Sequence, residues 1–405
     1  MRETLIKTPA STHGRHRSGP SSDGFSPAYT VSRRVDETIS VIYLHRARRA
    51  PMPLQDAAML VPCPSAVSID PVSCRPRLAM ARLPTPFEPA KRLAKYLGVS
   101  SVHIKREDMA GYALGGNKLR QLDFILAEAI AAEADMLIAT AGSQSNFCRS
   151  LAGAAAKLGL GCHLHVRARM GTELVGNLLL DDIFGAEVTF TQETDPWHPA
   201  IKDEIEAIAD RYRGQDRSPF VVQLTGVSAN VGVAGWMSGA AELCADFKAI
   251  GRIPDSVVVV CGSGLTAAGL ALGFKHLGVP TRVMGVSAQQ PEARLRKWIT
   301  ETANTAAAWM GIETRLSGQD FDIVDEEIGP GYGIPSDASV AAVRTAGRLE
   351  GLVLDPVYTG KGMAALIGAA EKGLLGKASS IVFLHSGGTP GLFTHASAFD
   401  RTARP

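Results

Sequence analysis

From about residue 76 onwards, short β-branched apolar runs alternate with alanine-rich windows. The windows at 119–134 and 147–159 repeat apolar residues at a helical period. The apolar runs are predicted to be strands: 102–108, 135–142, 162–168, 186–191, 220–226, 255–262, 281–288 and 379–386. Continuous apolar strands separated by helices of about 10–15 residues predict a parallel α/β sheet that is covered on both faces.

The first 75 residues are rich in Arg, Ser and Pro and lack a sustained apolar period. Such a segment cannot bury enough apolar surface to offset its chain entropy. We therefore expect residues 1–75 to be a disordered extension, with one short strand at 38–44. Two alternatives are an over-extended start and an organelle transit peptide, against which Asp23, Asp36 and Glu37 argue.

The composition narrows the class of protein. A chain of 405 residues is long enough for two domains, and 45% hydrophobic with 20% charged residues is typical of a soluble globular protein. The net charge of +2 favours no nucleic acid or other polyanion as a partner. The most apolar stretch, 256–274, contains four glycines, which favours a strand, a turn and a helix over a membrane span.

The six cysteines are scattered and include no CxxC pair, so we expect reduced thiols and a cytoplasmic protein. His163 and His165 share one strand face, but no third ligand is apparent. No metal site is predicted.

Ligands bind parallel sheets where strands end and loops enter helices. One such junction is GGNK, in which Gly115 and Gly116 permit a tight backbone approach and Lys118 falls at a helix start. The helix dipole disfavours a charged amine there, which suits a lysine that forms a Schiff base. The alternative is a turn followed by a solvated surface lysine.

The junction TAGSQSN (140–146) brings Gln144, Ser145 and Asn146 to a helix N-terminus. Hydroxyl and amide groups there can bind an anion together with the helix N–H groups. The alternative is an N-cap, which needs only one of these side chains.

The junction CGSGLTAAG (261–269) has the small residues of a phosphate cradle. It also approaches the fingerprint of a dinucleotide-binding turn. A nicotinamide enzyme, however, needs Asp or Glu near the end of the next strand, and that strand ends at Ser287. A single phosphate is the better interpretation.

The fourth junction is a pair of glycine-containing segments near the C-terminus, DPVYTGKGM (355–363) and FLHSGGTPGLF (383–393), preceded by GPGYGIP (329–335). They are predicted to present Tyr332 and Tyr358 to a pocket, with core packing as the alternative for each ring. Pyridoxal phosphate accounts for all four junctions. The aldehyde of this cofactor needs a lysine, and its phosphate needs an anion-binding turn. Its ring nitrogen needs a partner such as Ser386. The carboxylate of an amino-acid substrate needs hydrogen-bond donors.

Together with GNLLLDDIFGAE (176–187), these motifs resemble the D-cysteine desulfhydrase / 1-aminocyclopropane-1-carboxylate (ACC) deaminase family, a branch of the fold type II pyridoxal-phosphate enzymes. The resemblance extends from about residue 75 to 395. It implies two three-layer α/β/α domains, a small one at 121–229 inserted into a large one formed by 76–120 and 230–400. It also implies a homodimer.

The resemblance further implies a role for each motif residue. Lys118 would be the Schiff-base lysine, and Asn117 would lie beside the cofactor hydroxyl. The phosphate would be held by Gly262, Ser263, Gly264, Leu265 and Thr266, and the ring nitrogen would face Ser386. The substrate would contact Gln144, Ser145, Asn146 and Thr359, with Ser145, Tyr332 and Tyr358 assisting catalysis.

Thr359 and Ser386 bear on the reaction. ACC deaminases have an acidic residue at the place of Thr359, and a hydroxyl such as that of Ser386 leaves the ring a weaker electron sink. We therefore expect β-elimination from D-cysteine to pyruvate, ammonia and sulfide. The alternatives are an L-cysteate sulfo-lyase, an ACC deaminase and a non-catalytic binding relative. Phe147, Leu265 and the segment 225–232 depart from the family pattern near the substrate or phosphate.

Overall fold

The computed structural model describes residues 75–169, 172–193, 195, 198–223 and 227–400, together with Leu60, Val61 and Val72. Leu60–Val61 (β1) pairs antiparallel with Arg77–Leu78 (β2). The predictions of a disordered extension and of a strand at 38–44 otherwise lie outside the described residues.

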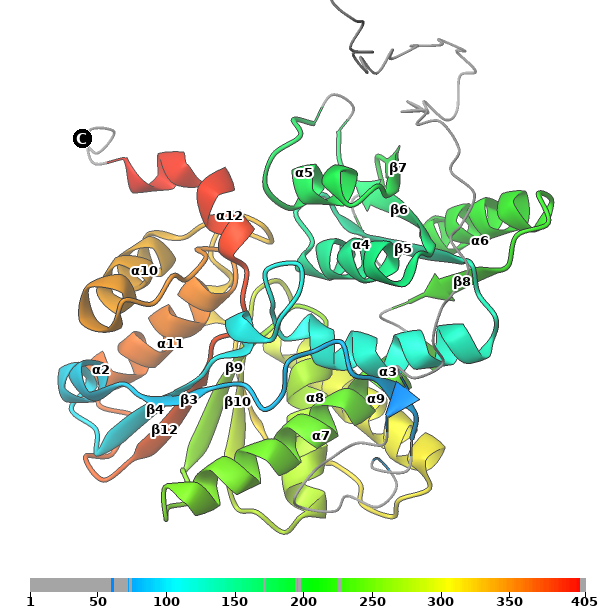
Figure 1. Cartoon of the computed structure of the whole chain (residues 1–405). Coiled ribbons are helices and arrows are strands. Elements are labelled where there is room, and N and C mark those ends of the chain that lie inside the picture. The colour runs from blue at the N-terminus through cyan, green and yellow to red at the C-terminus, as the bar shows by residue number, and fades with distance from the viewer. Residues whose placement is uncertain are drawn as a thin grey trace, which may run out of the picture.

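The larger of two main sheets has the strand order β11-β10-β9-β12-β4-β3 (Figure 1). Its strands are Phe87–Pro89 (β3), Ser101–Lys105 (β4), Ser256–Cys261 (β9), Arg282–Ser287 (β10), Asp322–Val324 (β11) and Ser380–Leu384 (β12). All neighbours are parallel except β3 and β4. Because β9, β12 and β4 are adjacent, the loops that follow them meet at one edge of the sheet.

Helices cover both faces of this sheet, and the strand β9 shows why its sequence is continuously apolar. Val257 and Val259 pack into the core under α7, α8 and α9, whereas Val258 packs into the core under α2, α10 and α11. The helices are Lys91–Leu97 (α2), Val227–Ala249 (α7), Leu265–His276 (α8), Glu292–Met310 (α9), Asp337–Glu350 (α10) and Thr359–Glu371 (α11). Short 3₁₀ helices span Glu107–Met109 (η2), Glu326–Ile328 (η3) and Ala396–Phe399 (η4).

The smaller sheet is wholly parallel, in the order β7-β6-β5-β8. Its strands are Met136–Gly142 (β5), Gly161–Arg167 (β6), Glu187–Thr191 (β7) and Pro219–Val222 (β8). Asn146–Leu158 (α4) and Gly176–Ile183 (α5) cover one face, and Pro199–Arg213 (α6) covers the other. Thr389–Thr394 (α12) packs against α5.

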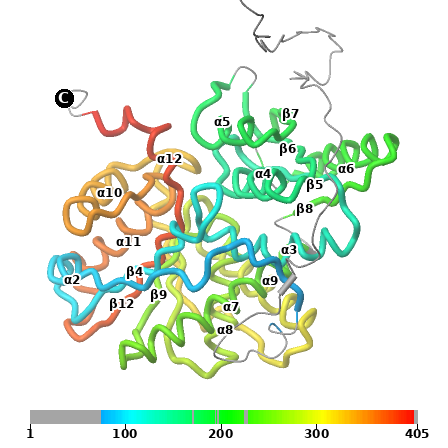
Figure 2. The backbone as a smooth tube through the Cα atoms, in the orientation of Figure 1, coloured from blue at the N-terminus to red at the C-terminus, as the bar shows by residue number. Residues whose placement is uncertain are grey.

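The two sheets, each between layers of helices, confirm the predicted fold class. The helix Lys118–Ala131 (α3) runs between them, in contact with α7 and α4 (Figure 2). The strands of the smaller sheet all fall within 121–229, but α3 packs on the helices of the larger sheet. The domain boundaries therefore stay a prediction. Among the described residues, no helix is both long and apolar enough to span a bilayer.

Candidate active site

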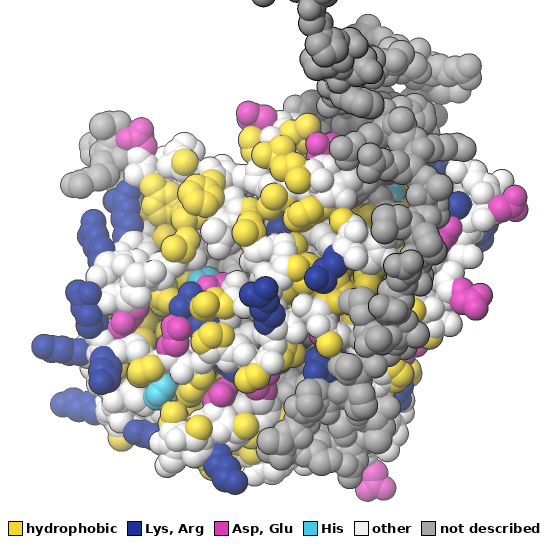
Figure 3. All heavy atoms as spheres, in the orientation of Figure 1, with side chains coloured by type: hydrophobic (Ala, Val, Ile, Leu, Met, Phe, Trp, Pro, Cys, Tyr) yellow, Lys and Arg dark blue, Asp and Glu magenta, His cyan; other side chains and the backbone are white. Residues whose placement is uncertain are grey.

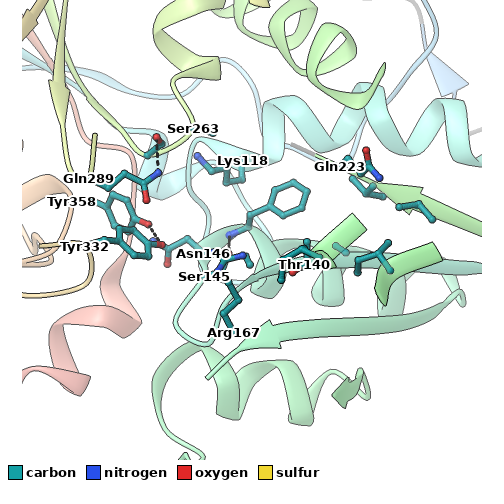
Figure 4. A pocket seen from close by; sticks show the side chains of 18 of the residues that line it. Lys118, Thr140, Ser145, Asn146, Arg167, Gln223, Ser263, Gln289, Tyr332 and Tyr358 are labelled. Carbon is teal, nitrogen blue, oxygen red and sulfur yellow. Dashed lines mark hydrogen bonds between the residues drawn. The ribbon is translucent and has the colours of Figure 1, made fainter. Parts of the chain in front are cut away.

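A cavity of about 480 Å³ lies where the carboxyl edges of the two sheets face each other (Figure 4). The predicted site residues that line it are Asn117, Lys118, Ser145, Asn146, Gly262, Ser263, Tyr332, Tyr358 and Ser386. The predicted residues outside this lining are Gln144, Gly264, Leu265, Thr266 and Thr359. The four junctions thus meet in one place, although not every side chain predicted there faces the cavity.

The turn before Lys118 packs backbone against backbone, which explains its glycines. Gly115 has φ of +62°, and a Cβ atom there would lie 2.1 Å from the carbonyl oxygen of Asp108. Gly387 has φ of +92°, and its Cβ would lie 2.9 Å from the Cα of Gly116. The amide of Asn117 donates to the carbonyl of Ser386 at 3.1 Å. This contact fixes the start of α3 beside the turn that follows β12.

Lys118 is the first residue of α3, as predicted, and its side chain is partly buried in the cavity wall. Its Nζ lies 3.4 Å from Oδ1 of Asn117. The pKa of Lys118 is lowered to about 8, mainly by burial and also by the nearby Arg149 guanidinium, whereas Cys261 opposes the shift. About a tenth of the amine is therefore neutral and nucleophilic at pH 7, and about half at pH 8.

This pKa gives a test on the apoprotein. Only the neutral amine reacts with acetic anhydride, so the labelling rate of Lys118 should rise with pH and reach half its maximum at about pH 8. Peptide mass spectrometry after brief acetylation at a series of pH values measures this midpoint, with the other lysines of the same sample as references. A midpoint near the ordinary lysine value of 10.5 contradicts the assignment.

The segment predicted to cradle a phosphate is the start of α8. Gly264 is its N-cap, and the amides of Leu265, Thr266 and Ala267 are the first of the helix, where no carbonyl of the same helix can accept them. Such N–H groups and the helix dipole favour a phosphate. Leu265 offers only its backbone amide to this turn, since its side chain is buried.

Three hydrogen bonds tie this segment to the rest of the site. Nδ2 of the buried Asn117 donates to the Thr266 hydroxyl at 2.9 Å, which links the lysine turn to α8. Side chains on the other flank hold the loop carbonyls: Gln289 donates to Gly262 at 3.0 Å, and Trp298 donates to Ser263 at 2.8 Å.

Some polar side chains of the turn after β5 line the cavity, and others bond only to the surrounding protein. Ser145 caps α4, since its Oγ accepts from the amides of Phe147 and Cys148 at 3.2 Å each, and it also lines the cavity. Asn146 lines the cavity while its Oδ1 accepts from Asn177 at 2.9 Å. Gln144 turns away: it donates to the Val175 carbonyl and accepts from the Asn177 amide. Its role is to hold the start of α5.

The two predicted tyrosines form a pair at one side of the cavity (Figure 4). Their hydroxyl oxygens are 2.6 Å apart, and the rings meet edge to face. Burial, together with Tyr332, raises the pKa of Tyr358 well above its ordinary value. The Tyr358 phenol therefore stays protonated near neutral pH and is available as a donor.

Asp355 does not line the cavity but holds the turn of Tyr358, a role that the sequence did not reveal. Its buried carboxylate accepts from the amides of Val357, Tyr358 and Thr359 and from the Thr359 hydroxyl, at 2.8–3.0 Å. It also lies against Gly388, where a Cβ would come within 2.5 Å of it. Asp355 thus fixes Tyr358 relative to the turn of Ser386. It also explains why Thr359 does not reach the cavity.

Other lining residues also escaped sequence reasoning: Arg167 at the end of β6, Gln289 after β10, Gln223 directly after β8, and Thr140 within β5. For Arg167, Gln223 and Gln289 the only signal was a position at a strand end. Among the described lining residues there is no Asp or Glu. His163 and His165 instead bond to Thr189, and no described group of three His, Cys, Asp or Glu side chains is placed to hold a metal ion.

Comparison with known proteins was made on sequence and on structure. A family model described as pyridoxal-phosphate dependent enzyme matches residues 78–387. The D-cysteine desulfhydrases of Salmonella choleraesuis (strain SC-B67) and Salmonella newport (strain SL254) are each 36% identical, over 79% of this chain and 96% of theirs. A solved ACC deaminase homologue superposes with a TM-score of 0.73 at 30% identity, over 81% of this chain and 96% of that one. Apo diaminopropionate ammonia lyase of Escherichia coli shares the fold over 80% of this chain and 87% of its own, at 15% identity and a TM-score of 0.59.

Proposed function

Because this chain belongs to the family of pyridoxal-phosphate-dependent enzymes, we propose that it is a carbon–sulfur lyase that converts D-cysteine to pyruvate, ammonia and hydrogen sulfide. The observation that carries the proposal is the Lys118 amine, with a pKa lowered to about 8, in the wall of a cavity that is also lined by Gly262 and Ser263 of the loop before α8. D-cysteine desulfhydrases that match over nearly their whole length support the substrate.

The residues of the site fit the cofactor. The unpartnered first amides of α8 suit its phosphate, Lys118 suits its aldehyde, and Ser386 suits its ring nitrogen. When bound, pyridoxal phosphate supplies an electron sink for the pair that is released when the Cα–H bond of the substrate breaks.

We assign a different role to each side chain around the bound cofactor. Ser145 and Asn146, at the N-terminus of α4, bind the substrate carboxylate. Lys118 takes the Cα proton, because the Ser145 hydroxyl already accepts two N–H bonds and is the weaker base. The protonated phenol of Tyr358, paired with Tyr332, donates to the leaving sulfur.

A lining without carboxylates favours elimination over cyclopropane opening. With no described Asp or Glu in the lining, the Ser386 hydroxyl would be the partner of the ring nitrogen and would not hold it protonated. A weak sink suffices when a good leaving group departs from the β-carbon. ACC deamination is therefore the less favoured alternative, and L-cysteate cleavage, which expels sulfite, remains the nearest one.

A substrate panel tests the proposal. The purified holoenzyme is given D-cysteine, L-cysteine, L-cysteate, D-serine, β-chloro-D-alanine and ACC, and pyruvate, 2-oxobutyrate, sulfide and sulfite are measured. We expect pyruvate and sulfide in equal amounts from D-cysteine. Formation of 2-oxobutyrate from ACC at a higher kcat/KM contradicts the lyase assignment, and a cofactor-loaded protein inactive on the whole panel indicates a binding relative.

We also propose that the enzyme acts in the cytoplasm as a homodimer. The described cysteines, Cys148, Cys162, Cys244 and Cys261, are free thiols, which supports a reducing compartment. Hydrophobic side chains gather on the face around α5 and α12 (Figure 3), among them the exposed Leu179, Ile183 and Phe393. An exposed apolar surface of this kind supports a partner subunit. Light scattering in solution measures the mass.

A further inference from the structure

Arg149 on α4 is a fully buried side chain that contacts two turns of the candidate active site. Its Nη2 donates to the carbonyl oxygen of Gly115 at 2.9 Å, three residues before Lys118. Its Nη1 donates to Oδ1 of Asn146 at 3.3 Å, in the turn that we assign to the substrate carboxylate. Lys118 and Asn146 both line the cavity (Figure 4). One side chain behind the cavity wall therefore joins the lysine turn to the turn of the smaller sheet.

The contacts of Asn146 determine which end of its amide is available to a ligand. Its Oδ1 accepts from Nη1 of Arg149 at 3.3 Å and from Nδ2 of Asn177 at 2.9 Å. Asn177 is itself held, since its Nδ2 also donates to the Gln144 carbonyl at 2.9 Å. Two donors on the amide oxygen leave Nδ2 of Asn146 as the group that can serve the cavity. An N–H donor there can bind a carboxylate, whereas a flipped amide would present an oxygen that repels it.

Among the described residues, the Arg149 guanidinium donates only to uncharged groups: the Gly115 carbonyl, the side-chain amides of Asn146 and Asn177, and the Ser150 hydroxyl. The pKa of Arg149 is lowered to about 10, mainly by burial, while Asp181 and Tyr112 oppose the shift, so the side chain is still a cation at pH 7. Asp181 on α5 is also buried, and within the described part of the chain neither of its carboxyl oxygens has a hydrogen-bond partner. Burial raises the pKa of Asp181 to about 8, which Arg149 opposes, so most of this carboxyl is neutral at pH 7. The charge of Arg149 is therefore largely uncompensated.

This charge acts on Lys118. Burial is the main cause of the lowered pKa of that amine, the Arg149 guanidinium adds to the shift, and Cys261 acts in the opposite direction. A nearby cation disfavours the protonated amine because like charges repel. The same cation attracts an anion, so a carboxylate bound at the turn of Asn146 would offset the cost of burying the guanidinium. The position of Arg149 thus suits both a neutral lysine and an anionic substrate group.

We infer that Arg149 is a positioning residue of this active site: it holds the amide of Asn146 with its N–H group toward the substrate carboxylate, and its charge disfavours a second cation on the Lys118 amine. The inference rests on the proposed function, because it explains how the roles assigned there to Asn146 and Lys118 are maintained. Arginine suits the task because its rigid, planar guanidinium can donate to the Gly115 carbonyl and to Asn146 at the same time.

Two variants separate the charge of Arg149 from its geometry. Arg149→Gln keeps an amide donor but removes the charge, whereas Arg149→Lys keeps the charge but loses the planar set of donors. Acetylation of the apoprotein over a series of pH values reports the charge effect. The midpoint for Lys118 should lie about half a pH unit or more above the wild-type midpoint in Arg149→Gln. Arg149→Lys should keep the wild-type midpoint.

Kinetics and binding on the holoenzyme report the geometry. Both variants should raise KM for D-cysteine by about tenfold or more, because Asn146 loses one of the two donors that fix its amide. Propanoate and propanamide have no amino group to react with the cofactor, and they differ in the charge of one end. In calorimetric titrations the wild type should bind propanoate at least about tenfold more tightly than propanamide, and both variants should lose most of this preference.

The matched control is Arg217→Gln. Arg217 is a partly buried arginine that bonds to Asp135 at the amino edge of the smaller sheet, away from the cavity, so this change should alter neither readout.

Two outcomes overturn the inference: an unchanged Lys118 midpoint in Arg149→Gln, or a wild-type KM and propanoate preference in Arg149→Lys. If Arg149→Gln does not fold, Arg149→Lys alone decides. A wild-type holoenzyme that is inactive on D-cysteine contradicts the proposed function instead, and the acetylation midpoints and the propanoate comparison then still decide the role of Arg149.

Discussion

The Lys118→Ala variant is expected to lose at least about 10³-fold in kcat on every substrate, because alanine removes both the attachment point of the cofactor and the base for the Cα proton. The same change should prevent borohydride reduction from fixing the cofactor to the peptide that begins α3. Pyruvate formation and peptide mass mapping of the reduced holoenzyme measure the two effects.

A matched control is available in the same cavity. Lys202 on α6 also lines it but is exposed, so Lys202→Ala should retain turnover and the borohydride-fixed peptide at Lys118. Partial recovery of Lys118→Ala by added ethylamine would separate loss of the base from misfolding. Retained turnover without an added amine, or a cofactor fixed at another lysine, contradicts the assignment.

The Asp355→Ala variant should lower the free energy of unfolding by about 3–5 kcal/mol, because three amides and one hydroxyl lose their acceptor in a buried place. Denaturant unfolding of the apoprotein measures this loss. The backbone of Tyr358 is among the groups released, so kcat on D-cysteine should fall as well.

Two conservative changes calibrate this effect. Thr359→Val removes one hydroxyl donor and leaves the carboxylate, so it should cost about 1 kcal/mol. Asp355→Asn keeps one carbonyl oxygen as an acceptor and should fall between the two. If Asp355→Ala unfolds like the wild type, water replaces the carboxylate without cost, and the turn does not depend on it.

The arrangement of the core could be predicted because both faces of the larger sheet are covered. The run SVVVV is apolar at every valine, which is typical of a central strand buried on both faces of a sheet. The strands β3 and β11 were missed because each has three residues at a sheet edge, where burial leaves little pattern. The predicted end of β8 at residue 226 extended past Val222, where the strand stops.

In the site, local motifs identified the turns but not the direction of every side chain. Lys118 and Ser145 are placed by the helix start on which each stands. Gln144 and Thr359 bond to Asn177 and Asp355, and nothing in their own motifs distinguishes those contacts from a ligand. The importance of Arg149 depends on the contact of α4 with the lysine turn, which a single sequence does not display.

The contact between the turns of Gly116 and Gly387 has a consequence for biosynthesis. The strand β12 lies between β4 and β9, so nearly the whole polypeptide must leave the ribosome before the centre of the larger sheet can close. A nascent chain that stops short of Ser380 has the reactive lysine but lacks the turn that seats it. We therefore expect pyridoxal phosphate to bind only after synthesis of the chain is nearly complete.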